Sequence, residues 1–136
     1  MPAPEQVART VAEAEGAMIE VHGAEAARRL GLTTQMPAQA VFHTTGSSHQ
    51  LRLGKLVVRL QHVAPRKLAL AGRPAGQALS ALWYLGRSQV TPDTFKQIAK
   101  KLPAGEFEAL SGAKASMPAW MVEALARYER SEPAHA

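Results

Sequence analysis

An alternating stretch around Gly54-Lys55 limits the possible fold of this chain more strongly than any other feature. Residues 50–53 (Gln-Leu-Arg-Leu) and 56–61 (Leu-Val-Val-Arg-Leu-Gln) flank this pair, and a glycine at the first central position suits the two-residue turn of a β-hairpin. The apolar side chains that share one face in that register are Leu51, Leu53, Leu56 and Val58. A ribbon with one apolar face has to be covered, so the hairpin predicts a sheet with another layer packed on it.

The rest of the chain shows short helical and strand patterns. Residues 4–15 and 23–30 have helical patterns, whereas residues 17–22 and 38–44 are typical of strands. Helical patterns then dominate from residue 65 to the end. This order predicts an α+β fold: a small, mostly antiparallel sheet of about four strands, with N-terminal helices and a helical C-terminal half packed on it.

The C-terminal half is expected to consist of several short helices. The first of them carries Leu79, Leu82 and Trp83 as an apolar stripe. With 136 residues the chain is long enough for one domain with its own core. We expect this single domain over residues 1–130, followed by a frayed tail at residues 131–136.

The positive charge is concentrated in the middle of the sequence. Residues 31–90 contain no Asp or Glu, whereas they hold seven basic residues: Arg52, Lys55, Arg59, Arg66, Lys67, Arg73 and Arg87. The flanks have mixed signs, because residues 1–30 have three basic residues against five glutamates and residues 91–136 have six of each sign. An uncompensated positive field favours a partner of opposite sign, such as nucleic acid phosphate or an acidic protein surface.

Two parts of this stretch can bring basic side chains together. In the hairpin, two arginines project from the face opposite the leucines. In the glycine-rich connection at residues 65–76, free backbone N–H groups at a helix start can bind an anion. The alternative is structural: Gly72 takes an unusual backbone angle and Gly76 lets the helix approach the sheet. We predict that partner or phosphate binding uses the side chains of Arg52, Arg59, Arg66, Lys67 and Arg73 and the backbone of Gly72 and Gly76.

Other chemistry is not indicated. The chain has no cysteine, which excludes disulfides and thiol catalysis. Its histidines lack the spacing of a metal site and its serines lie in no nucleophile pattern, so we expect no catalytic residue, metal or cofactor. An enzyme would require His43 and His62 to meet a carboxylate from a flank. The N-terminal sequence has no signal-peptide pattern and no apolar run reaches roughly 20 residues, so we expect a cytoplasmic protein without a membrane partner.

A set of segments spread over nearly the whole chain carries a family resemblance. In order, they are residues 23–27, 30–38, 41–46, 64–69, 71–76, 78–86 and 118–121. With these segments the chain resembles the bacterial AbiEi-like antitoxins of type IV toxin–antitoxin and abortive-infection systems. Members of that family usually begin with a winged helix-turn-helix domain that binds promoter DNA. This chain looks like the C-terminal antitoxin domain without it.

The resemblance implies a function without catalysis. We expect a non-enzymatic antitoxin-type domain that counteracts a nucleotidyltransferase-like toxin through a basic surface, either by direct contact or on a shared target. The alternative is a small regulatory protein that binds the backbone of DNA or RNA. The basic ribbon offers no aromatic platform beyond Phe42, so duplex backbone or an acidic protein fits it better than base stacking.

Overall fold

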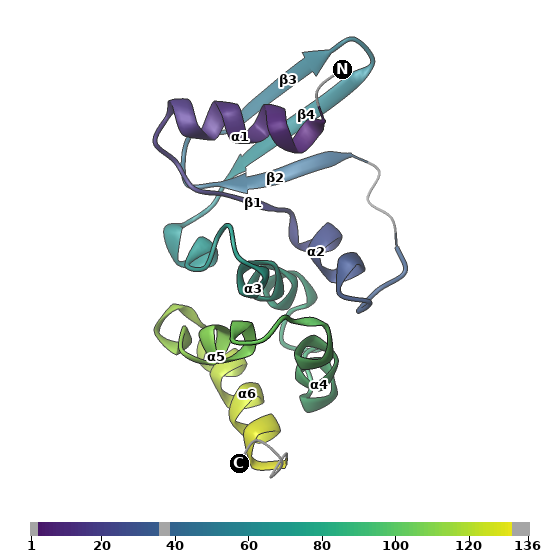
Figure 1. The fold of residues 1–136 in the computed structure, drawn as a ribbon, viewed down its shortest axis with the longest axis vertical. Coiled ribbons are helices and arrows are strands. Elements are labelled where there is room, and N and C mark those ends of the chain that lie inside the picture. Colours follow the sequence, from purple (N-terminus) through teal and green to yellow (C-terminus); the bar gives the residue numbers. More distant parts are fainter. Residues whose placement is uncertain (1–2, 36–38, 132–136) are drawn as a thin grey trace.

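The computed structural model describes residues 3–35 and 39–131, which form an α+β fold (Figure 1). The elements are α1 (Pro4–Ala14), β1 (Ile19–Val21), α2 (Gly23–Arg29), β2 (Ala40–Thr44), β3 (His49–Leu53), β4 (Leu56–His62), η1 (Pro65–Leu68), α3 (Pro74–Leu85), α4 (Pro92–Lys101), α5 (Glu106–Ser111), η2 (Lys114–Ser116) and α6 (Ala119–Ser131). The predicted order of helices and strands is confirmed, with two short 3-10 turns added. Ser131 belongs to α6 rather than to a tail, and the rest of the expected tail lies outside the described residues.

The sheet has the strand order β1-β2-β4-β3. Two of its three pairings are antiparallel, while β2 and β4 run parallel. The predicted hairpin register is confirmed, because Leu51 pairs with Val58 and Leu53 with Leu56. The turn glycine, Gly54, has a φ of 63°, as a tight hairpin turn with glycine at this position requires.

Helix α1 covers one face of this sheet (Figure 1). Its Ala8 and Ala12 are buried, and so are Val58 and Leu60 of β4. Because the alanines are small, the helix approaches the sheet closely. The larger side chains of β4 fill the space between the helix and the sheet. Arg59 alternates with these residues and is exposed on the opposite face. The apolar face that the sequence predicted for the hairpin is therefore covered by the N-terminal helix α1.

The C-terminal half packs through α3, which contacts α2, β1, η1 and α5. Leu79 and Leu82 of α3 are completely buried, as are Phe95 of α4 and Leu125 of α6. In Figure 1 the helices α3 to α6 form a second layer below the sheet. The expected helical stripe is thus the core of this half, except that Trp83 is half-buried and lies at its margin.

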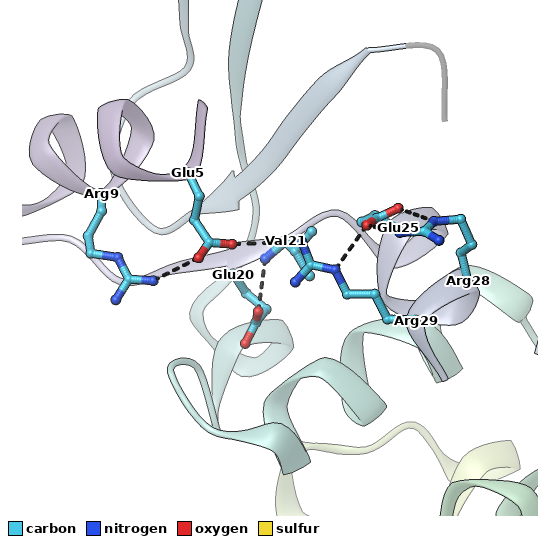
Figure 2. Close-up of polar contacts among 7 residues, drawn as sticks. All are labelled: Glu5, Arg9, Glu20, Val21, Glu25, Arg28 and Arg29. Carbon is cyan, nitrogen blue, oxygen red and sulfur yellow. Dashed lines mark hydrogen bonds and ion pairs between the residues drawn. The ribbon is translucent and has the colours of Figure 1, made fainter. Parts of the chain in front are cut away.

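A chain of ion pairs connects α1 with α2 (Figure 2). Glu25 accepts hydrogen bonds from Arg28 Nε at 2.7 Å and from Arg29 Nε at 2.9 Å. Arg29 also lies 3.9 Å from the carboxylate of Glu5, which pairs with Arg9 at 3.3 Å. Arg29 therefore links the helix over the sheet to the helix that packs on α3.

This network predicts an acid-sensitive contribution to stability. The hydrogen bond from Arg28 lowers the pKa of Glu25 from 4.5 to about 2. The contribution is therefore present above about pH 4.5 and is lost as the pH falls towards 2. We expect Glu25→Gln to lower the free energy of unfolding at pH 7 by about 0.5–2 kcal/mol, the sum of two partly exposed ion pairs, and urea titrations at pH 7 and pH 3 measure it.

The matched control is Glu123→Gln, which breaks an exposed ion pair with Arg127 on one helix. An exposed i,i+4 pair contributes about 0.3–0.5 kcal/mol. Equal losses in the two variants, or a Glu25→Gln loss that is as large at pH 3 as at pH 7, would contradict the assignment.

Candidate functional site

The sheet register gathers basic side chains on the face that α1 leaves open. Gln50 of β3, Arg59 of β4 and Val41 of β2 lie side by side across three strands. Arg52 lies diagonally next to Arg59 on the same face, and both arginines are exposed. A groove of about 530 Å³ runs along this face, and its lining contains no carboxylate. The lining residues are His22, Val41, Ser48, His49, Gln50, Arg59, Leu60 and Gln61.

The 3-10 turn η1 extends the positive charge beyond the strands. The guanidinium carbon of Arg66 lies 5.4 Å from the centre of the Trp83 ring, and Lys67 Nζ lies 4.8 Å from it. Both distances are typical of cation–π contacts. Lys67 also lies close enough to His43 to lower the pKa of that side chain. Because His43 pairs with Gln61 on the open face of the sheet, Lys67 lies next to that face. We call Arg52, Arg59, Arg66 and Lys67 the basic surface.

The basic surface has no internal counter-charge among the described residues. Within the described part of the chain, Arg59 donates to the side-chain oxygen of Gln39 at 3.4 Å, and Arg66 donates to the backbone oxygen of Ser116 at 3.5 Å. None of the ion pairs within residues 3–35 and 39–131 involves the four residues of this surface. Their charges are therefore available to an external partner.

Arg73 and the glycine-rich connection have partners inside the chain. Arg73 pairs with Glu106 at 2.9 Å, and the same carboxylate accepts the N–H of Ala75 at the start of α3 at 3.1 Å. These two contacts lower the pKa of Glu106, the arginine more strongly. The N–H of Gly72 points to the carboxylate of Glu20 at 3.4 Å. The positions predicted for an external anion are thus held by two of the chain's own carboxylates.

The glycines of this connection have backbone roles. Gly72 has a φ of 88°, as the structural alternative expected. A side chain on Gly76 would overlap the carbonyl of Leu70 and approach Glu20 Oε2 to 2.9 Å. We therefore leave Arg73, Gly72 and Gly76 out of the basic surface, because contacts within the chain explain their geometry.

The histidines do not meet as the enzyme alternative requires. His43 pairs with Gln61 and the next pair joins Thr44 to His62, so His43 and His62 point to opposite faces. His62 Nδ1 lies 2.8 Å from the backbone oxygen of Gly46, and His49 contacts Glu15 at 3.1 Å. The ring next to His43 belongs instead to His22, with 4.7 Å between ring centres.

A small pocket around His22 and His43 contains residues that the sequence did not indicate as functional candidates. A pocket of about 120 Å³ is lined by His22, Gly23, His43, Lys67, Ser80, Trp83 and Tyr84. One signal was available: His22 stands directly before α2, where Ser, Thr, Asp or Asn are usual. Its Nδ1 accepts the N–H of Ala24 at 3.0 Å, so it caps that helix. The described residues contain no group of three side chains suited to a metal ion.

The comparisons place the chain in a family without a known activity. Neither the curated proteins nor the solved structures gave a match. Within the described part of the chain, no helix has the length and apolar character needed to cross a membrane. The sequence model described as "Family of unknown function (DUF6088)" matches residues 1–110, which include the basic surface and the pocket beside it. The chain therefore belongs to the DUF6088 family.

Proposed function

We propose that this protein is a non-enzymatic, antitoxin-type binding domain that acts in the cytoplasm through its basic surface. The observation that carries the proposal is that Arg52, Arg59, Arg66 and Lys67 have no ion-pair partner within the described residues. A single-signed surface of this kind steers and orients a partner of opposite charge. The class of partner, a nucleotidyltransferase-like toxin with an acidic surface, comes from the resemblance to AbiEi-like antitoxins.

The geometry of the pocket histidines supports binding rather than catalysis. His22 uses Nδ1 to cap α2, and the lining of the pocket contains no carboxylate that would orient His43 as a general base. Burial lowers the pKa of both rings, that of His43 to about 4. These histidines are therefore neutral at pH 7, and their environment disfavours the imidazolium that a catalytic base would form.

Nucleic acid backbone is the second candidate partner, because the same charges suit phosphate. The residues that line the groove along the open face include no Phe, Tyr or Trp, and the Trp83 ring beside η1 lies under two cations. Single-stranded binding normally uses exposed aromatic rings on which bases stack. The nucleic acid that suits this surface is therefore a duplex, bound through its phosphate backbone.

Growth rescue in a bacterial host tests the leading proposal. The proposal expects a nucleotidyltransferase-like toxin to be encoded beside this chain. This toxin is induced with and without the chain, and we expect co-expression to restore growth. Unchanged toxicity at equal expression would contradict the proposal.

The salt dependence of binding separates the two candidates. Binding to a 20-base-pair duplex should weaken log-linearly with salt, with a slope near −0.9 for each phosphate neutralised. Binding to the toxin should weaken less, because part of a protein interface is apolar. Tight, steeply salt-dependent duplex binding without growth rescue would favour the second candidate.

A further inference from the structure

The pocket between α2, β2, η1 and α3 has the composition of an anion site. Its volume of about 120 Å³ is several times the roughly 10–15 Å³ that one water molecule needs, so it has room for a small polyatomic group. It contains one cationic side chain, Lys67, and its lining includes no Asp or Glu. No ion pair involving Lys67 occurs within the described residues.

Two hydrogen bonds determine which polar groups of the pocket remain available. Because the Nδ1 of His22 accepts from the backbone, the proton of the neutral ring is assigned to Nε2, which is then a donor. The hydroxyl of Ser80 donates to the backbone oxygen of Val21 at 3.1 Å. The strongest acceptor on His22 and the proton of Ser80 are therefore already in use.

The ring of Trp83 lines the pocket beneath Lys67. Its Nε1 is buried and is the one side-chain nitrogen or oxygen of the described residues that is both buried and without a hydrogen-bond partner. An indole N–H can only donate, and leaving a buried donor unpaired is costly. Because this nitrogen has almost no accessible surface, a group in the pocket does not reach it in this arrangement, and the pocket offers Lys67 and the assigned Nε2–H of His22.

We propose that this pocket binds a phosphate group, with Lys67 and His22 as its principal binding residues and the Trp83 ring as the wall beneath Lys67. A tetrahedral phosphate presents several acceptor oxygens, so it can accept from donors that come from different elements, and hydrogen bonds to a charged group are the strong ones. A metal ion fits poorly, because His22 Nδ1 is engaged and Lys67 repels cations. The inference goes beyond the proposed function, since it concerns a small ligand that can be tested without a protein partner.

The two tryptophans of the chain, Trp83 and Trp120, provide a reporter and an internal control for NMR. Sodium phosphate is titrated to about 50 mM at constant ionic strength, a range that detects a millimolar dissociation constant. We expect a saturable shift of the Trp83 indole N–H signal and none of the Trp120 signal. Equal shifts with sodium chloride or acetate, or no saturable shift at Trp83, would overturn the proposal.

Variants of Lys67 test the charge without removing the reporter. Lys67→Met keeps most of the side-chain stem and should weaken phosphate binding roughly tenfold, the effect of losing one hydrogen bond to a charged group. Lys67→Arg should bind phosphate. Lys96→Met, at an exposed position of α4, should leave the affinity unchanged. Unchanged affinity in Lys67→Met, with its fold confirmed by circular dichroism, would also overturn the proposal.

The source of the phosphate group is decided by a parallel titration. Tighter binding of a nucleoside monophosphate than of inorganic phosphate would show that the group is part of a larger ligand, whereas equal or weaker binding would identify the free ion. Both results support a phosphate site. The double variant Arg52→Glu/Arg59→Glu should retain the Trp83 shift, so failure of this site and failure of the proposed function are separate outcomes.

Discussion

Arg52→Glu/Arg59→Glu is expected to weaken binding of the toxin partner at least about 100-fold and to abolish growth rescue. Both arginines are exposed on the open face of the sheet, and the double reversal replaces attraction to an acidic surface by repulsion, which costs several kcal/mol. Their positions alternate with the apolar residues that face α1, so the core is not changed. Circular dichroism and thermal unfolding should match the unmodified protein, while titration calorimetry with the toxin measures the loss.

The matched control is Lys96→Glu/Lys100→Glu, which makes the same change in net charge on exposed positions of α4. It should reduce affinity by less than about threefold, because exposed charges beyond a Debye length of about 8 Å are largely screened. A control that loses as much affinity as the hairpin variant would mean that binding follows net charge alone. That outcome would contradict the assignment of the site to this face.

Gly76→Ala is expected to lower the free energy of unfolding by at least about 3 kcal/mol, the upper range for overpacking a core. The added carbon would overlap the carbonyl oxygen of Leu70 and lie 2.7 Å from its carbon, and both are backbone atoms that cannot rotate away. It would also lie 2.9 Å from Glu20 Oε2, a carboxylate that is buried. Urea unfolding followed by circular dichroism measures the change.

Gly72→Ala is the comparison within the same connection. Gly72 has a positive φ, and an added carbon would meet no atom within 4 Å. Its cost should therefore be the backbone penalty alone, about 1–2 kcal/mol. If the two variants were destabilised equally, steric contact at the start of α3 would not be the reason for a glycine at position 76.

Local patterns explain which parts of the fold were predictable. The hairpin register follows from alternating side chains on both sides of a two-residue turn, and the order of helices and strands follows from periodicity. The parallel pairing of β2 with β4 could not be derived in this way. It joins segments separated by a third strand, and no short-range pattern specifies which neighbour a strand takes.

In the candidate site, too, the contacts between residues close in sequence were predictable and the contacts between distant residues were not. Arg52 and Arg59 share a face because of local alternation, whereas the ion pair between Arg73 and Glu106 joins residues 33 positions apart. A stretch free of acidic residues in the sequence is therefore not free of them in space. His22 and His43 are a further case, since they meet only because β1 pairs with β2.

The bonds at Val21 protect one of the two edges of this sheet. Its N–H donates to the Glu20 carboxylate at 2.9 Å (Figure 2), and its carbonyl oxygen accepts from the hydroxyl of Ser80. A strand from another molecule that approaches the β1 edge finds both groups occupied, which protects an edge strand against intermolecular pairing. Burial raises the pKa of Glu20, so this carboxylate becomes protonated at a higher pH than an exposed one, and a neutral carboxyl group is a weaker acceptor. Acid should thus weaken the protection of this edge, the β1 edge, against pairing with a second molecule.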